Sequence, residues 1–305
     1  MIIANDLTKR FAGVAALDHL NCRIPDGCVY GLVGANGAGK STFLRLASGV
    51  YQPDGGSITL DGEPVFENTN VKKRFAYVSD EFWMLPQSDM ARMARLYAAA
   101  YKAFDGKRFA ELTEEFQLNP AQPLSTFSKG MRRQAATILA LCTGARTYFF
   151  DETFDGLDPV MRTRVRQRLY AEVVDRGCTV IVTSHSLREL EDTCDQLALL
   201  YKGGVVLQSD VGELKTSLFK LQVAFDHEYD RSLFEGMDLL SFEKQGSVAT
   251  LVVRGDPEKS RALLASKAPL LLETLPVTLE EVFVYEMEAL GYAFNAADAK
   301  GGTHA

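Results

Sequence analysis

The sequence predicts an α/β fold in which a core built on a parallel sheet precedes a small α+β domain. Between Arg133 and Leu214, helical segments alternate with the short apolar strands 148–150 and 179–182, which is the pattern of a parallel sheet. Upstream, a glycine-rich loop separates an apolar strand from a helix. Beyond Ser217 the pattern changes to strands with period-two alternation. A large domain is therefore expected before a smaller one.

Composition and charge narrow the class of protein. Of the 305 residues, 47% are hydrophobic and 24% are charged, so two domains can each bury a core. The net charge of −7 argues against a general nucleic-acid binder, which needs a basic face.

Cysteine usage and hydropathy indicate the compartment. The five cysteines include no Cys-x-x-Cys pair, which predicts buried free thiols in a reducing compartment rather than disulfides or a zinc cluster. The N-terminus lacks the features of a signal peptide, and no apolar run is long enough to cross a bilayer. Any membrane part is therefore expected on another chain.

The segments before the alternating region are of two kinds. The first sixty residues or so are rich in predicted strands, with a turn signal at 53–56 before the strand 57–60. From about 86 to 122 the pattern becomes helical. Side chains recur there at the i, i+3, i+4, i+7 spacing of one helix face, at Met90, Met93, Ala94 and Tyr97.

Residues 216–290 are predicted to form the small C-terminal domain. The expected strands 219–225 and 249–253 alternate in period two, and a Thr278-x-x-Glu281 capping box begins a later helix. The tail 291–305 ends in a polar, glycine-rich run, and we expect it to fray.

The loop from Gly34 to Thr42 reads Gly-Ala-Asn-Gly-Ala-Gly-Lys-Ser-Thr and matches the phosphate-binding pattern G-x-x-x-x-G-K-[ST]. It follows the apolar run 28–33 and leads into a helix, the setting in which glycines let backbone N–H groups point at phosphate oxygens. Lys40 is expected to reach the β- and γ-phosphates, and Ser41 to bind Mg²⁺. A chance glycine-rich turn does not explain this setting. The predicted nucleoside-triphosphate contacts are Gly34, Asn36, Gly37, Ala38, Gly39, Lys40, Ser41 and Thr42.

Two acids, Asp151 and Glu152, follow the apolar strand 148–150. Parallel strands deliver the side chains at their carboxyl ends to the ligand crevice. We therefore expect Asp151 to hold Mg²⁺ and Glu152 to orient the attacking water as a general base. Alone, the pair would suit solvated acids at a strand end; the phosphate loop favours the catalytic interpretation.

Between the loop and the acids lies Phe-Ser-Lys-Gly-Met, residues 127–131. The order and spacing of these motifs resemble the ATP-binding subunits of ABC transporters over residues 1–215, with 127–131 in the place of the family's signature loop. The resemblance implies a P-loop NTPase core with an antiparallel β subdomain and a helical subdomain at about 86–135. It also implies ATP and Mg²⁺ as cofactors and head-to-tail pairing of two subunits.

The resemblance assigns further roles. The signature loop of one subunit contacts the γ-phosphate held by the other, which implies that role for Ser128, Lys129, Gly130 and Met131. A hydroxyl, backbone N–H groups and a helix N-terminus suit an anion site, although such a segment alone would be read as an ordinary helix start.

Three more positions match the family. The run 155–159, Asp-Gly-Leu-Asp-Pro, is similar to the D-loop, with Asp158 at its matching acid; as a plain pattern it is a turn into a helix. His185 matches the switch histidine, which contacts the γ-phosphate, and a Ser186-x-x-Glu189 capping box is expected to place it at a helix entrance. Phe11 matches the aromatic that stacks on adenine, and it equally suits a core position.

One position departs from the family. Asp80 stands where a glutamine is usual, in the loop that joins the core to the helical subdomain. A carboxylate can also bind Mg²⁺, which makes Asp80 a candidate metal ligand; the alternative is a surface acid without a catalytic role. The apolar run 82–85 that follows suits contact with the membrane subunit.

The function implied is an ATP-hydrolysing subunit of an ABC transporter that drives a separate integral membrane permease. The Ser-Lys-Gly-Met signature and the segment 278–283 resemble those of antibiotic- or lipid-exporting systems, which favours export. The subunit is expected at the cytoplasmic face of the membrane, bound through the permease. It would be paired with a second copy of itself or a homologous ATPase subunit and would bind no nucleic acid.

Other functions remain as alternatives. The main one is a soluble ABC-type ATPase without a permease, with an assembly or regulatory role. An ABC protein of nucleic-acid repair or translation usually carries a coiled-coil insert or a second cassette, which this sequence does not show. A sensor that binds without hydrolysing has no need of Asp151, Glu152 and His185.

Overall fold

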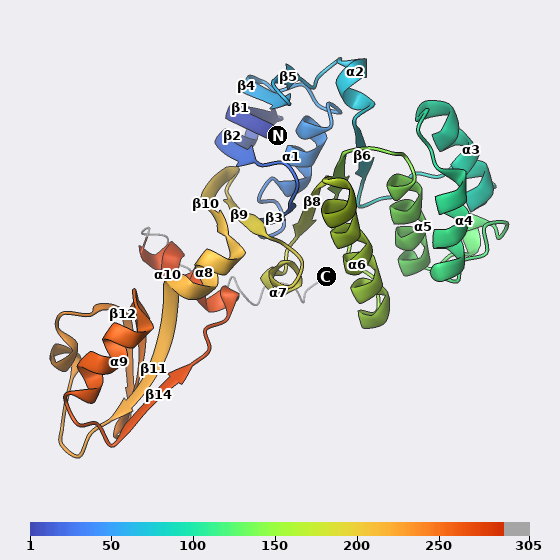
Figure 1. The fold of residues 1–305 in the computed structure, drawn as a ribbon. Helices are drawn as coiled ribbons and strands as arrows, with labels where there is room; N and C mark the ends of the chain where they lie inside the picture. Colours follow the sequence, from blue (N-terminus) through green and yellow to red (C-terminus); the bar gives the residue numbers. More distant parts are fainter. Residues whose placement is uncertain (290–305) are drawn as a thin grey trace. The chain divides into compact units, whose positions relative to one another are not determined.

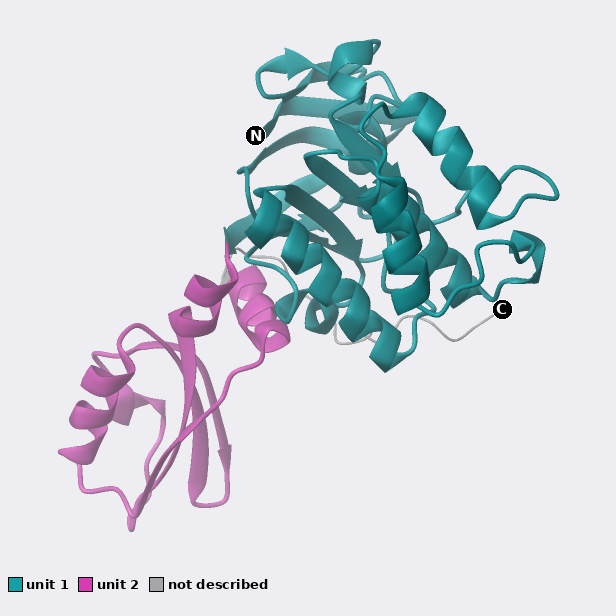
Figure 2. Cartoon of the chain, turned by 45° about the vertical axis from the view of Figure 1, so that its right-hand side comes forward, with its two compact units in different colours: residues 1–209 teal, residues 210–305 magenta. Residues whose placement is uncertain are grey.

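The computed structural model describes residues 1–289 and forms two compact units, the first comprising residues 1–209 and the second beginning at Asp210 (Figures 1 and 2). This boundary lies a few residues before the 215–216 junction expected from the sequence. The reason is local: the Asp210 carboxylate caps helix α8 (Val211–Ser217), and α8 packs on another helix of the second unit. The expected tail 291–305 lies outside the described residues.

The central sheet of the first unit consists of six strands. In spatial order they are β10 (Gly204–Asp210), β9 (Gln196–Tyr201), β3 (Val29–Val33), β8 (Thr179–Ser184), β7 (Thr147–Phe150) and β6 (Phe75–Val78). The pairs from β9 to β6 are parallel, which confirms the expected parallel sheet. All residues of β3, β7 and β8 are buried, as is typical of central strands in a sheet covered on both faces. Their carboxyl ends therefore share one edge.

An antiparallel sheet precedes the central one, in the order β2 (Val14–Ile24), β1 (Ile2–Phe11), β4 (Gly55–Leu60) and β5 (Glu63–Pro64). Helix α1 (Lys40–Ala47) packs on β2 and β4, and its Phe43 and Leu44 are fully buried. The short helix α2 (Thr69–Lys72) begins at the Asn68 cap. The predicted richness in strands is confirmed, and one apolar core joins this sheet to the central one.

A helical group lies beside the central sheet (Figure 1). It contains α3 (Met90–Ala100), α4 (Gly106–Glu115), the 3₁₀ turn η1 (Leu124–Thr126) and α5 (Lys129–Leu141). Helices α3 and α4 pack on α5. Met90, Met93 and Ala94 are buried and Tyr97 is half-buried, so the expected helix face is confirmed. Helices α6 (Pro159–Arg176) and α7 (Leu187–Glu191) pack on β3 and β8.

The second unit is built on a four-stranded antiparallel sheet (Figure 2). Its order is β12 (Asp238–Gln245), β13 (Val248–Arg254), β11 (Leu218–Ala224) and β14 (Leu271–Leu275), accompanied by η2 (Arg231–Phe234), α8, α9 (Pro257–Ala265) and α10 (Leu279–Ala289). Alternate residues of β11 and β13, such as Leu221 and Leu251, form its core, as the period-two pattern predicted. The Thr278–Glu281 capping box is confirmed by reciprocal hydrogen bonds.

The cysteines are consistent with the sequence-based expectation. All five are buried and carry free thiols, at Cys22, Cys28, Cys142, Cys178 and Cys194. Within residues 1–289, no group of three or more His, Cys, Asp or Glu side chains is arranged to hold a metal ion. Within the same residues, every helix is too short or too polar to span a bilayer.

Candidate active site

The phosphate loop lies between the end of β3 at Val33 and the start of α1 at Lys40. Its shape requires glycine: Gly37 has φ +82° and Gly39 has φ +106°, in the left-handed region. Space is also limiting at Gly39, where a Cβ atom would lie 2.7 Å from the Ala16 carbonyl oxygen. The glycines thus give the loop the turn that directs backbone N–H groups inward.

Lys40 is buried at the first turn of α1. Its Nζ donates hydrogen bonds to the carbonyl oxygens of Gly34 at 2.7 Å and Ala35 at 3.3 Å. The same Nζ lies 3.4 Å from Oε1 of Glu152. An ammonium held this way is already desolvated beside the loop, where phosphate oxygens would bind it strongly.

Asp151 follows β7 and is fully buried. Its Oδ1 accepts hydrogen bonds from Ser41 Oγ at 3.0 Å and Thr183 Oγ1 at 2.8 Å. Burial raises the pKa of this carboxyl, and the bonds from Thr183 and Ser41 oppose the shift. A cation beside it would favour the ionised form, and an all-oxygen donor set suits Mg²⁺, which usually takes few protein ligands and completes its shell with phosphate and water. Ser41 and Asp151 therefore fit such an ion.

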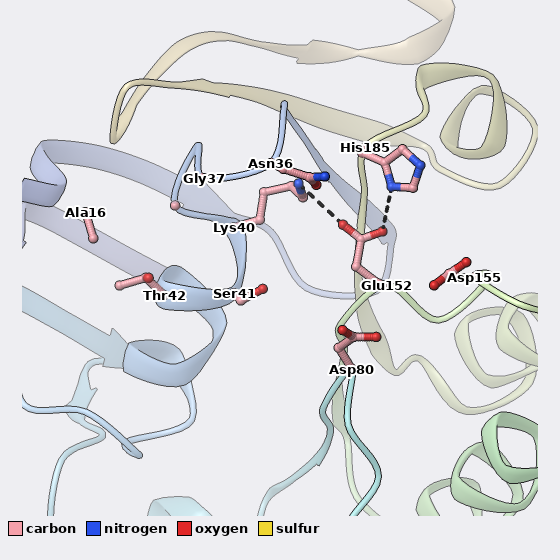
Figure 3. A pocket seen from close by; sticks show the side chains of 11 residues that line it. Ala16, Asn36, Gly37, Lys40, Ser41, Thr42, Asp80, Glu152, Asp155 and His185 are labelled. Carbon is pink, nitrogen blue, oxygen red and sulfur yellow. Dashed lines mark hydrogen bonds and ion pairs between the residues drawn. The ribbon is translucent and has the colours of Figure 1, made fainter. Parts of the chain in front are cut away.

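Glu152 has φ +47°, an unfavourable value for a residue that is not glycine. Strained backbone of this kind clusters at functional sites because the surroundings must hold it. Here the Glu152 N–H donates to Thr183 Oγ1 at 2.9 Å, which ties the turn to β8. The conformation directs the Glu152 side chain between Lys40 and His185 (Figure 3).

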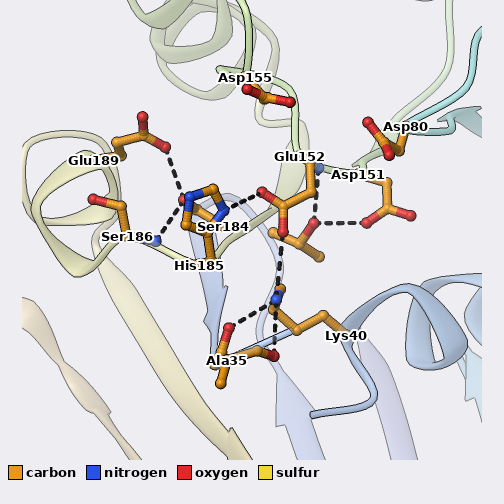
Figure 4. A network of polar contacts seen from close by, with 12 residues as sticks. Ala35, Lys40, Asp80, Asp151, Glu152, Asp155, Ser184, His185, Ser186 and Glu189 are labelled. Atoms are coloured by element: carbon orange, nitrogen blue, oxygen red, sulfur yellow. Dashed lines mark hydrogen bonds and ion pairs between the residues drawn. The ribbon is translucent and has the colours of Figure 1, made fainter. Parts of the chain in front are cut away.

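His185 directly follows β8, and its Nδ1 lies 3.1 Å from Oε2 of Glu152 (Figure 4). The capping box expected beside it is wrong. Ser184 Oγ donates to the Glu189 carboxylate at 2.8 Å and accepts from the Ser186 N–H at 3.0 Å. The last residue of β8 therefore bonds the two groups that a capping box would pair with each other. The Ser186 side chain makes no capping bond, and α7 has only five residues.

These groups line a cavity of about 470 Å³. Its lining includes most of the predicted loop residues with Asp80, Glu152 and His185, and adds Ala16 and Asp155, which sequence reasoning did not select. The full lining is Ala16, Asn36, Gly37, Gly39, Lys40, Ser41, Thr42, Asp80, Glu152, Asp155 and His185. Gly34, Ala38 and Asp151 lie outside this lining, although Gly34 and Asp151 bond to lining residues.

Asp80 lies at the cavity but does not act alone. Its Oδ1 is 2.7 Å from Nη2 of Arg133, a buried residue of α5. Sequence reasoning did not identify Arg133 as a site residue. The available signal was its position on the α5 face that also carries the buried Ala136 and Thr137, because an arginine placed there requires acceptors.

Residues 127–131, here called the signature segment, are not among the residues that line the cavity. Ser128 caps α5 by accepting a hydrogen bond from the Met131 N–H at 3.2 Å. Lys129 forms an ion pair with Asp155. Contact between this segment and the nucleotide of a second subunit stays a prediction.

Asp158 and Phe11 also lie apart from the cavity lining. Asp158 caps α6, its Oδ1 accepting hydrogen bonds from the N–H groups of Val160 and Met161, each at 2.9 Å. Phe11 is exposed at the end of β1, so the core alternative for it is wrong, and its ring centroid lies 5.4 Å from that of Tyr51. Nucleotide contact by either residue stays a prediction.

The fold and this site define a P-loop ATPase, and comparison with known proteins places it further. A family model described as ABC transporter matches residues 17–155. The chain is 28% identical over 284 residues to the ABC transporter ATP-binding protein YtrB of Bacillus subtilis, covering 93% of this chain and 97% of that protein.

Two further relatives have higher identity. The daunorubicin/doxorubicin resistance ATP-binding protein DrrA of Streptomyces peucetius is 35% identical over 224 residues, 71% of this chain and 67% of that protein. The Nod factor export ATP-binding protein I of Rhizobium etli is 30% identical over 295 residues, 92% of this chain and 91% of that protein. The chain belongs to the family of ABC transporter ATP-binding subunits, which bind and hydrolyse ATP.

The solved structures agree on the fold. A dimeric, post-hydrolysis state of the ATP-binding cassette MJ0796 bound to ADP and Pi matches with a TM-score of 0.63 at 21% identity, covering 69% of this chain and 99% of that chain. The P-loop cassette fold expected from the sequence is thereby confirmed.

Proposed function

We propose that this chain is the motor subunit of an export system. Two copies, or one copy and a homologous subunit, pair head to tail and enclose ATP between the phosphate loop of one and the signature segment of the other. Closure and hydrolysis then drive an integral membrane permease, with the subunit held at the cytoplasmic face through it. The dimeric state of the related cassette MJ0796 supports the pairing. The association of DrrA with daunorubicin/doxorubicin resistance and of the Rhizobium etli protein with Nod factor export supports export.

The catalytic assignment of Glu152 rests on the position of its carboxylate between Lys40 and His185. One carboxylate oxygen faces Lys40 Nζ at 3.4 Å and the other faces His185 Nδ1 at 3.1 Å. Both partners orient the carboxylate toward the cavity, where an attacking water would lie against the γ-phosphate. Lys40 would exchange its loop carbonyl acceptors for phosphate oxygens.

Ser41 and Asp151 would hold Mg²⁺, because Ser41 Oγ and Asp151 Oδ1 lie only 3.0 Å apart and already share a hydrogen bond. When bound, Mg²⁺ supplies positive charge that neutralises the phosphate oxygens. Asp80 is a weaker candidate ligand, since Arg133 already neutralises its carboxylate. His185 supports the transition state by holding Glu152 and by reaching the γ-phosphate.

The loop between β6 and α3 suits the permease contact. Trp83 is 64% exposed there, and an exposed tryptophan is typical of a residue that becomes buried at an interface. Isolation of the subunit with its membrane partner tests the direction of transport: a permease of the exporter type is expected. An importer-type permease that requires a substrate-binding protein would overturn the proposal of export.

Replacement of Glu152 by Gln tests the catalytic assignment. The variant keeps the size of the side chain but cannot accept a proton, so the hydrolysis rate should fall by roughly 10² or more while ATP still binds. Glu114→Gln on the exposed face of α4 is the matched control and should hydrolyse ATP at the unmodified rate. Hydrolysis by Glu152→Gln at the unmodified rate would contradict the assignment.

A further inference from the structure

Lys129 and Asp155 connect the signature segment to the cavity within one chain. Lys129 Nζ lies 2.5 Å from Asp155 Oδ2. Lys129 is the first residue of α5, directly after the Ser128 cap, whereas Asp155 lies in the turn between Glu152 and α6 and lines the cavity. One ion pair therefore joins the surface that faces another subunit's nucleotide to the chain's own nucleotide cavity.

The backbones of the two turns also touch. A Cβ atom on Gly130 would lie 2.7 Å from the Gly156 carbonyl oxygen. Gly156 has φ +75°, and a Cβ atom there would lie 3.1 Å from Cδ of Lys129. Glycine at both positions allows this close approach.

The ion pair is suited to exchange. The Lys129 side chain is 63% exposed and that of Asp155 is 44% exposed, and pairs so open to water contribute little to stability. The lysine ammonium sits on a flexible four-carbon chain with three donors, so it can turn to a new acceptor. The hydrogen bond from Lys129 lowers the pKa of the Asp155 carboxyl, which is therefore an ionised competitor at neutral pH.

We propose that Lys129 exchanges between two anions: Asp155 when the subunits are apart, and the γ-phosphate of ATP held by the other subunit when they close. This inference rests on the head-to-tail pairing proposed above. The terminal phosphate carries more negative charge than one carboxylate and is the stronger partner. The exchange leaves Asp155 unpaired at the chain's own cavity, so closure over one nucleotide changes the charge around the other. Lys129 thereby couples the two sites.

The test measures dimerisation rather than turnover. Full-length E152Q protein with ATP and Mg²⁺ is examined by analytical ultracentrifugation. K129M in this protein should weaken the ATP-dependent dimer about tenfold because the phosphate loses a cationic partner. D155N should tighten it about threefold because the competing carboxylate is gone. K129R, which keeps the charge, should retain most of the affinity.

The double variant K129M/D155N distinguishes exchange of Lys129 from a local effect of Asp155 on the ATP bound by the same subunit. If exchange operates, D155N tightens the dimer only while Lys129 is present, so the two substitutions are not additive. K107M is the matched control, since Lys107 is also an exposed lysine paired with an acid, Glu111. It should leave the dimer unchanged.

The outcomes distinguish this inference from the proposed function. A D155N dimer that is weaker or unchanged, or that is tightened equally with and without Lys129, would overturn the exchange. Absence of any ATP-dependent dimer in the E152Q parent would instead overturn the head-to-tail pairing of two copies of this chain.

Discussion

The buried guanidinium of Arg133 neutralises Asp80 at the edge of the nucleotide cavity. Arg133 is 3% exposed and the Asp80 side chain is 49% exposed, with 2.7 Å between Nη2 and Oδ1. Nη1 of the same arginine donates to the carbonyl oxygens of Ser79 at 3.1 Å and Asp151 at 3.3 Å. An acid at the position where the family usually has glutamine is thus balanced by a residue that also holds the backbone of the catalytic turn.

Loss of Arg133 should therefore cost more stability than loss of the Asp80 charge. Arg133→Met removes the donor from the buried Asp151 carbonyl and from the part-buried Ser79 carbonyl, and should lower the free energy of unfolding by about 2–3 kcal/mol. Asp80→Asn should lower it by about 1 kcal/mol, because half of the carboxylate is already in water. Urea unfolding of both variants and of the double variant measures this. Strictly additive losses would show that the two residues do not act as a pair.

His185→Ala should reduce kcat by roughly 10–100-fold, because the histidine orients the Glu152 carboxylate. The affinity for ATP should change by less than about threefold, because the histidine acts more on Glu152 than on the bound phosphates. Steady-state hydrolysis and binding of a fluorescent ATP analogue separate the two effects. His227→Ala is a suitable control, since Nδ1 of His227 also faces a carboxylate, Asp226 at 2.9 Å, in the second unit. Equal rates for His185→Ala and the unmodified protein would remove His185 from the mechanism.

Two substitutions of Asp158 separate its role as the cap of α6 from its predicted contact with the nucleotide. Asp158→Ala removes the cap of α6 and should lower the free energy of unfolding by about 1 kcal/mol. Asp158→Asn retains a capping oxygen without the charge and should unfold nearly as the unmodified protein does. If Asn also leaves ATP hydrolysis unchanged while Ala lowers stability, Asp158 is a cap only, and its predicted nucleotide contact is wrong.

The buried thiol of Cys22 indicates that the folded protein loses stability at alkaline pH. Burial raises the pKa of its thiol from the ordinary 9.0 to about 11, and the hydrogen bond with Tyr30 reduces the shift. Between these values the unfolded chain releases a proton that the folded chain keeps. Stability is therefore full below about pH 9 and falls as pH rises toward 11, by up to ~1.4 kcal/mol per pH unit from this thiol.

The measurement for Cys22 is urea unfolding at several pH values from 8 to 10. Cys22→Ala loses packing at every pH, but its stability should decline less steeply, since one titrating thiol is gone. Parallel declines in the variant and the unmodified protein would show that the Cys22 thiol does not titrate differently in the two states.

The sequence was sufficient for the parts of the site that depend on local pattern. Lys40 and Glu152 follow strands of a parallel sheet, and such strands bring their carboxyl ends to one edge whatever else the chain does. The alternating pattern likewise placed His185 after β8. Phosphate-loop glycines were identifiable because only glycine adopts the required backbone angles at low cost.

The remaining contacts depend on packing between distant segments. Arg133 meets Asp80 only because α5 packs on β6, and Lys129 meets Asp155 only because two glycine turns come together. Ser186 and Glu189 have the spacing of a capping box, yet the Glu189 carboxylate accepts from the Ser184 hydroxyl, and the Ser186 N–H donates to that same hydroxyl. Local spacing cannot report such competition.

The exposed side chain of Trp83 has a practical consequence. It is the single tryptophan among 305 residues, so the intrinsic tryptophan emission of the whole chain arises from one loop. Water around the indole sets a long emission wavelength, and transfer into an apolar interface shortens it. Unlabelled protein therefore carries its own optical probe of docking, readable during titration with a membrane partner.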